Sequence, residues 1–121
     1  MLINHAGLAS AGKFDGETIE QWQWVFNLNL LGQFRMTKAC LPLIHNREAA
    51  DKSIVIIASQ AGFTAAPGMA SFCVTKATVI SLSETLYLEL SARDIHVSVV
   101  CPTFFDSNLN QSLRTSDGKC N

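Results

Sequence analysis

Residues 53–59 read Ser-Ile-Val-Ile-Ile-Ala-Ser, an apolar run rich in β-branched residues and without polar alternation. Such a run is typical of a strand that is buried on both faces, as the strands of parallel sheets are. Two shorter apolar segments, residues 1–3 and residues 96–101, have the same character, and Pro102 ends the second. We therefore predict three strands, at residues 1–3, 53–58 and 96–101.

The segments between these strands have helical patterns. Thr18 is a predicted N-cap, and Gln21 three residues later completes a capping box. Apolar residues at helical spacing follow, first from 19 to 26 and then from 30 to 44, with Asn27-Leu28-Asn29 at the join between two helices. A third helix is predicted over residues 71–91, with apolar positions three and four apart. Residues 9–15 are expected to form a loop.

Strands that alternate with helices indicate an α/β fold with parallel strands joined by right-handed crossovers. In such sheets, ligands gather at the carboxyl ends of the strands. The segment Asn4–Gly7, Ser59 and Pro102 each follow a predicted strand directly. The sequence therefore predicts that these residues lie along one edge of the sheet.

The composition limits the possible functions. The chain has 121 residues, 48% of them hydrophobic, and a formal net charge of −1. This balance argues against a nucleic-acid partner and against a polybasic membrane anchor. The four cysteines have no metal-ligand spacing, so no metal site is expected. Because no apolar run has the length of a membrane span and residues 1–20 do not read as a secretory leader, we expect a soluble, cytoplasmic protein with no membrane partner.

A longer pattern begins at Ser59. Thirteen residues later the chain reads Phe72-Cys73-Val74-Thr75-Lys76. This spacing resembles the serine–tyrosine–lysine core of the classical short-chain dehydrogenase/reductase family. The resemblance covers the chain from Leu2 to about Leu109. Three further segments contribute to it: Asn4-His5-Ala6-Gly7, similar to Asn-Asn-Ala-Gly; Asn29, similar to the asparagine of the catalytic tetrad; and residues 102–107, similar to Pro-Gly-x-Val-x-Thr with Thr103 in place of the glycine.

The resemblance implies a partial Rossmann-type fold, in which residues 1–109 are the C-terminal part of the domain and the N-terminal cofactor-binding half is absent. Residues 110–121 are expected to be a polar, frayed tail. The implied cofactor is NAD or NADP, and the implied substrate is a small alcohol or carbonyl compound. The implied catalytic positions are Asn29, Ser59, Phe72 and Lys76. The implied contacts to the nicotinamide-ribose end of the cofactor are Asn4, Ala6, Gly7, Lys76 and Pro102.

Two departures from the family pattern predict that the isolated chain is inactive or weakly active. Phe72 stands where the family has its tyrosine, and a phenyl ring cannot donate or accept a proton. Ser71, Thr75 and Tyr87 are poor substitutes, because they lie on other faces or turns of the same helix. The sequence also has no Gly-x-x-x-Gly-x-Gly turn to hold a pyrophosphate.

Three explanations stay open at this point: a truncated enzyme, a degenerate non-catalytic relative, or an interaction protein that pairs with a full-length relative. The family commonly dimerises through two long helices, here about residues 29–44 and 71–91, so the resemblance implies a homo-oligomer or association with a relative. We also expect the helices to cover mainly one face of the sheet. The other face of strands 54–57 and 97–100 would then be half bare, which favours association.

Overall fold

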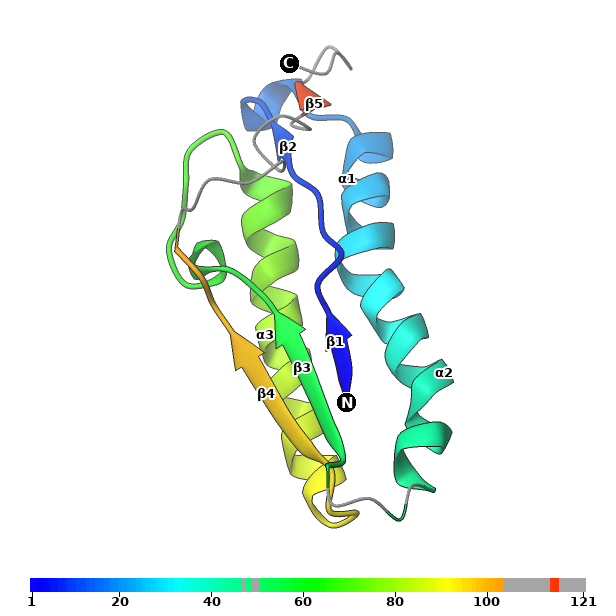
Figure 1. The fold of residues 1–121 in the computed structure, drawn as a ribbon. Coiled ribbons are helices and arrows are strands. Elements are labelled where there is room, and N and C mark those ends of the chain that lie inside the picture. The colour runs from blue at the N-terminus through cyan, green and yellow to red at the C-terminus, as the bar shows by residue number, and fades with distance from the viewer. Residues whose placement is uncertain (47, 49–50, 104–113, 116–121) are drawn as a thin grey trace.

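The computed structural model of the chain describes residues 1–46, 48, 51–103 and 114–115. Its main sheet has three parallel strands in the order β1-β3-β4, formed by Leu2–Asn4, Ser53–Ile57 and His96–Val100 (Figure 1). In the register, Ile54 of β3 lies between Leu2 of β1 and Val97 of β4. The predicted α/β class, the parallel direction and the three strands are thereby confirmed.

The helices also follow the prediction, with one difference. The capping box at Thr18 begins α1 (Ile19–Phe26), and α3 spans Ala70–Ser91. The predicted join is a π-helical segment, η2 (Asn27–Gly32), which runs without a break into α2 (Gln33–His45). Residues on both sides of η2 keep right-handed helical backbone angles. The segments α1, η2 and α2 therefore form one continuous helical rod in place of the two separate helices that we expected.

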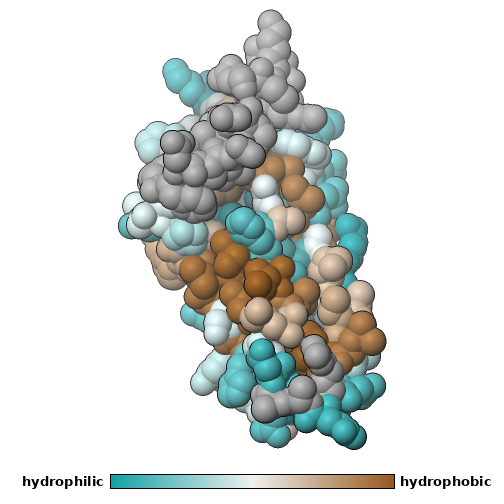
Figure 2. Space-filling view, viewed as in Figure 1, coloured by the Kyte–Doolittle hydropathy of each residue, from teal (hydrophilic) through white to brown (hydrophobic). Residues whose placement is uncertain are grey.

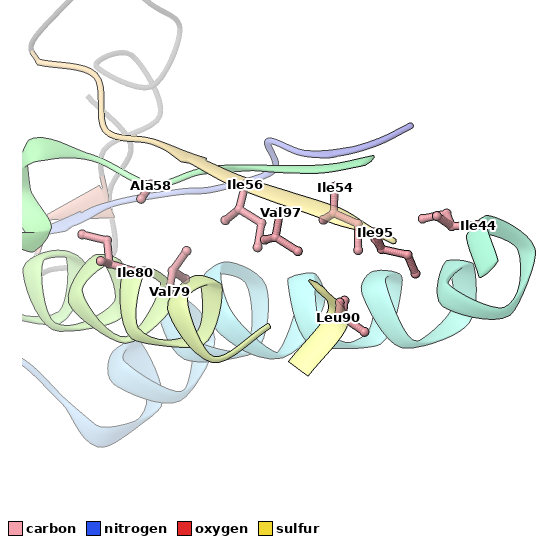
Figure 3. Close-up of a cluster of buried hydrophobic side chains, with 9 residues drawn as sticks. All are labelled: Ile44, Ile54, Ile56, Ala58, Val79, Ile80, Leu90, Ile95 and Val97. Carbon is pink, nitrogen blue, oxygen red and sulfur yellow. The ribbon is translucent and has the colours of Figure 1, made fainter. Parts of the chain in front are cut away.

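The helices cover one face of the sheet, as predicted. Figure 3 shows α3 and the α2 end of the rod beneath the strands, with the apolar core between them. Ile54 and Ile56 of β3 are fully buried there against Val79 of α3. On the opposite face Ile3 is 55% exposed and Val100 is 46% exposed. Figure 2 shows hydrophobic residues gathered over this open side of the strands.

One prediction about the loops is wrong. Ser10–Ala11, within the predicted loop, form a short strand, β2. It pairs in parallel with β5 (Arg114–Thr115), which lies in the segment expected to be a frayed tail. Ladder hydrogen bonds outweigh the weak local propensity of both segments, and such pairing over a long sequence separation is invisible to local patterns. The other residues of the tail lie outside the described residues.

Two 3-10 turns complete the described chain: η1 (Phe14–Gly16) and η3 (Gln60–Gly62). The second follows β3 directly and packs on α3, so it sets the path of the chain between the carboxyl end of the strand and the long helix. None of the helices in the described part of the chain is long and apolar enough to cross a bilayer.

Gly62 is required where η3 meets α3. A Cβ at this position would lie 2.6 Å from Ile80 Cδ1 and 2.9 Å from the Lys76 carbonyl oxygen. The backbone of α3 cannot move away without loss of core packing, so we expect Gly62→Ala to lower the free energy of unfolding by about 1–3 kcal/mol. Urea denaturation followed by circular dichroism measures this change.

Gly32→Ala is the matched control, because the same methyl group would meet nothing closer than the Asn27 carbonyl oxygen at 3.5 Å. Gly32 has helical backbone angles, so alanine there is expected to stabilise the chain by about 0.5–1 kcal/mol. Equal effects of the two substitutions would contradict the close contact between η3 and α3.

Candidate functional site

The carboxyl ends of the three strands meet at one edge of the sheet. Beyond the end of β3, the backbone N–H of Ala58 donates to Val100 at 2.8 Å, and that of Gln60 donates to Pro102 at 3.0 Å. These bonds place Ser59 beside Cys101. The chain after β1 runs past the same edge toward β2, with Ala6 exposed and Gly7 half-buried.

Asn29 is at the centre of the site and is fully buried. Its Nδ2 donates to the Leu8 carbonyl at 2.8 Å and to Thr75 Oγ1 at 3.1 Å, and its Oδ1 accepts from the Leu8 N–H at 2.8 Å. The π-helical segment η2 supplies this side chain, and short π-helical insertions occur frequently at functional sites. Asn29 therefore joins three parts of the molecule: the helical rod, the segment after β1, and α3.

Lys76 lies next to this network and is only 5% exposed. Its Nζ donates to the Ile57 carbonyl at 3.3 Å. A Cβ on Gly7 would lie 3.3 Å from Lys76 Nζ and 3.6 Å from Asn29 Oδ1. The structure thus brings Gly7, Asn29 and Lys76 together, with the bare Cα of the glycine between the two side chains.

Phe72 faces Lys76 from the preceding turn of α3. The ring is 5% exposed, and Lys76 Nζ lies 5.6 Å from its centroid, a cation–π geometry. A phenylalanine carries no phenol oxygen, so the ammonium group meets the face of a ring. Phe72 therefore serves as a wall of the site and as a partner of the lysine.

Of the three hydroxyl groups considered as substitutes, two are hydrogen-bonded elsewhere and one lies further along α3. Ser71 Oγ donates to Glu17 at 3.3 Å, and Thr75 Oγ1 donates to the Phe72 carbonyl at 2.9 Å. Tyr87 is 56% exposed and lines a shallow groove with Leu88 and Val97, further along α3. None of these hydroxyl groups is placed to replace the missing phenol.

Ser59 is half-buried and begins η3, where its Oγ accepts a hydrogen bond from the Ala61 N–H at 3.1 Å. The hydroxyl hydrogen is left for another acceptor. Asn4 has a different position: its Nδ2 donates to Thr37 Oγ1 at 2.8 Å, which holds β1 against α2. Its amide nitrogen is used within the fold. Among the expected cofactor contacts, Ala6, Gly7, Lys76 and Pro102 lie along the edge.

Cys101 is a member of the site that the sequence pattern did not single out. Burial raises the pKa of its thiol, while a hydrogen bond from the Ser59 backbone and the charge of Lys76 act in the opposite direction. Thr75, which the sequence analysis considered only as a substitute for the tyrosine, is a second member because it bonds Asn29. A signal for Cys101 is present in the sequence, because Cys101 is the last residue of a predicted strand and directly precedes Pro102. Ser59 has a similar place, directly after another predicted strand.

Burial also lowers the pKa of the Lys76 ammonium group, and Cys101 opposes this shift. Below the lowered pKa the folded chain must hold a desolvated charge, which destabilises it relative to the unfolded chain. Between the lowered pKa and the ordinary lysine value of 10.5, the unfolded chain binds more protons, so stability rises with pH in that window. We therefore expect the parent to gain unfolding free energy relative to Lys76→Met as pH rises to about 10.5.

Urea denaturation at several pH values measures this shift. Lys38→Met is the matched control, because Lys38 is exposed and its Nζ also lies 5.6 Å from a ring centroid, that of Phe34. The comparison of the two variants shows whether the change with pH is specific to the buried lysine. A flat profile for Lys76→Met would contradict the effect of burial on Lys76.

Comparisons with known proteins agree with this geometry. The family model described as short chain dehydrogenase matches residues 1–118. The chain is 34% identical over 118 residues to the inactive 2-(S)-hydroxypropyl-CoM dehydrogenase 2 of Xanthobacter autotrophicus, covering 96% of this chain and 50% of that protein. It is 34% identical over 113 residues to a 3-oxoacyl-[acyl-carrier-protein] reductase of Synechocystis, covering 93% and 45%.

Among solved structures, 4-hydroxyisoleucine dehydrogenase complexed with NADH is 26% identical, with a TM-score of 0.76 and coverage of 84% of this chain and 44% of that one. The chain spans about half the length of the curated relatives that it matches. The family match extends over nearly all of its residues and includes the whole of the described site. The chain belongs to the short-chain dehydrogenase family.

Proposed function

We propose that this chain carries the substrate-side half of the site of an NAD(P)-dependent oxidoreductase for alcohol or carbonyl compounds, and that the isolated chain is inactive or weakly active. Residues 1–109 then correspond to the C-terminal part of a Rossmann domain. The observation that carries the proposal is the contact of the Phe72 ring with Lys76 Nζ at 5.6 Å, where a proton donor would be needed. Relatives that are dehydrogenases and reductases by name support the reaction class.

The described residues fit the nicotinamide-ribose end of a dinucleotide. Lys76 Nζ has three N–H groups, and its hydrogen bond to the Ile57 carbonyl engages one of them. The others are available for ribose hydroxyl groups, and Gly7 keeps this position uncrowded, because a Cβ there would come within 3.3 Å of Lys76 Nζ. The Ser59 hydroxyl, half-buried at the end of β3, is able to hold a substrate oxygen.

The pyrophosphate end of a dinucleotide fits less well. A pyrophosphate is normally held by backbone N–H groups of a glycine-rich turn at a helix N-terminus. The sequence of this chain contains no such turn. When bound, NAD or NADP would supply the hydride acceptor or donor. The chain itself supplies the lysine, the serine hydroxyl and a rigid asparagine, but no side chain at position 72 that transfers a proton.

An assay of carbonyl reduction tests the proposal. The purified chain is mixed with NADPH or NADH and a panel of aldehydes and ketones, and the loss of nicotinamide absorbance is followed. We expect no turnover above the rate without protein. Turnover by the parent chain that is lost in Lys76→Met would contradict the proposed inactivity. The same result would show that another group replaces the phenol.

A second candidate function is supported by exposed apolar side chains on the outer faces of the long helices. Phe34, Met36 and Leu43 of α2 and Leu88 of α3 are all exposed. Large apolar groups that are exposed to solvent favour association. The chain would then pair with itself or with a full-length relative through these helices, in the cytoplasm. Co-elution with a relative in size-exclusion chromatography tests this function, and elution of both as monomers at micromolar concentration would exclude it.

A further inference from the structure

The helices are attached to the sheet in two different ways. At β3 and β4, apolar side chains such as Ile56 and Val97 fill the space above α3 (Figure 3). At β1 and the segment that follows it, the attachment is polar: Asn4 bonds Thr37 at 2.8 Å, and Leu8 bonds Asn29 at 2.8 Å. Figure 1 shows this segment running between α3 and the rod. These hydrogen-bonded groups form a polar line between the rod and β1, where buried polar groups replace an apolar core.

Gln33 lies in the middle of this polar line. It follows Asn29 by four residues and precedes Thr37 by four, so the three side chains project from about the same face of the rod. Gln33 is 3% exposed. Asn29 and Thr37 are hydrogen-bonded, but neither Nε2 nor Oε1 of Gln33 has a partner within the described residues.

A buried amide without partners is rare in folded proteins, because both its oxygen and its nitrogen lose hydrogen bonds to solvent. The amide can accept two bonds and donate two. Gln33 carries no charge and has no carboxylate beside it in the polar line, so a cation is not expected there. A group that is 3% exposed also admits no large ligand. Water is the ligand that satisfies both amide atoms at this depth.

We propose that Gln33 holds at least one buried water molecule, which joins its amide to the polar groups of Asn29 or Thr37 one turn away. Globular proteins contain about one buried water per 27 residues, so a few such sites are expected in a chain of this size. The water completes the polar attachment between the rod and β1. This inference does not depend on the proposed oxidoreductase function, because it concerns the unpartnered amide alone.

Nuclear magnetic resonance of the whole chain tests the proposal. We expect cross-relaxation between the Gln33 side-chain amide protons and water, measured in both the laboratory and the rotating frame to separate it from chemical exchange. We expect the cross-relaxation rate to have the sign that is characteristic of a long-lived contact, as for a water bound inside the protein. Absence of these cross-peaks, with those of the other buried amides assigned, overturns the proposal.

A variant pair gives a second, independent measurement. Gln33→Met keeps the length of the side chain and removes both hydrogen-bonding atoms. If water bridges the amide to its neighbours, the substitution removes the amide bonds that hold this buried water, and the midpoint of thermal unfolding falls by about 3 °C or more. If the amide is dry, removing it raises the midpoint, which overturns the proposal. Gln23→Met is the matched control, because Gln23 of α1 is exposed, and it is expected to leave the midpoint unchanged.

Discussion

Replacing Phe72 by tyrosine is expected to increase the rate of carbonyl reduction by about 10²–10⁴ in a protein that binds the cofactor. The substitution adds one hydroxyl group to a ring that already lies 5.6 Å from Lys76 Nζ. A positive charge at this distance lowers the pKa of a phenol, which eases the transfer of its proton to the carbonyl oxygen. A suitable context is a chimera in which the upstream part of the Synechocystis 3-oxoacyl reductase precedes this chain.

The rate is compared between chimeras with and without Phe72→Tyr, after binding of NADPH to both has been measured. Phe63→Tyr is the control, because it adds the same phenol to a ring that is 70% exposed, and it should leave the rate unchanged. Lys76→Met added to Phe72→Tyr should remove most of the gain. Equal rates in the parent chimera and its Phe72→Tyr variant, both with bound NADPH, would contradict the view that Ser59 and Lys76 are still correctly placed.

Asn29→Ala is expected to lower the free energy of unfolding by about 3–5 kcal/mol, the largest effect on stability that we predict. The substitution removes three hydrogen bonds and leaves the Leu8 N–H, the Leu8 carbonyl and Thr75 Oγ1 without this partner. Each buried polar group left unsatisfied costs about 1–3 kcal/mol. Asn29 is fully buried, so water cannot take its place without a rearrangement of the π-helical segment.

Urea denaturation measures the loss, and Asn27→Ala is the matched control. Asn27 belongs to the same π-helical segment but is exposed, so its removal is expected to change stability by less than about 0.5 kcal/mol. If Asn29→Ala is as mild as Asn27→Ala, the asparagine does not join the rod, the segment after β1 and α3. Its importance would then be limited to any role in catalysis.

Much of the fold could be predicted because its signals are local. The β-branched run at 53–58 predicts a strand, and the observed β3 is Ser53–Ile57. The capping box at Thr18 and Gln21 is confirmed atom by atom. The alternation of strands and helices leaves few topologies other than a parallel sheet.

The features that could not be predicted depend on contacts between distant residues. Pairing of β2 with β5 joins residues about a hundred positions apart, and neither segment has a strong strand propensity. Local propensity indicates a break at the π-helical segment, because Asn27 and Asn29 are weak helix formers whose side chains compete for backbone hydrogen bonds. In the structure Asn29 has its bonds elsewhere, on Leu8, so the helix continues.

For the site, the sequence predicts a set of positions, and the structure adds what each side chain contacts. Asn29, Lys76 and Gly7 meet at one point. Asn4 is expected at the cofactor, yet its side chain bonds Thr37 across β1 and α2. A one-letter pattern gives no direction for a side chain, so the two roles of an asparagine after a strand cannot be separated by sequence alone.

Our central claim is that this chain retains the substrate side of a dehydrogenase site but binds dinucleotide poorly and does not turn it over. Titration of the purified chain with NADH and NADPH, followed by nicotinamide fluorescence, tests it most directly. We expect no binding up to millimolar cofactor, because no glycine-rich turn is present in the sequence to hold the pyrophosphate. Saturable binding at micromolar cofactor, lost in Lys76→Met, would contradict the claim.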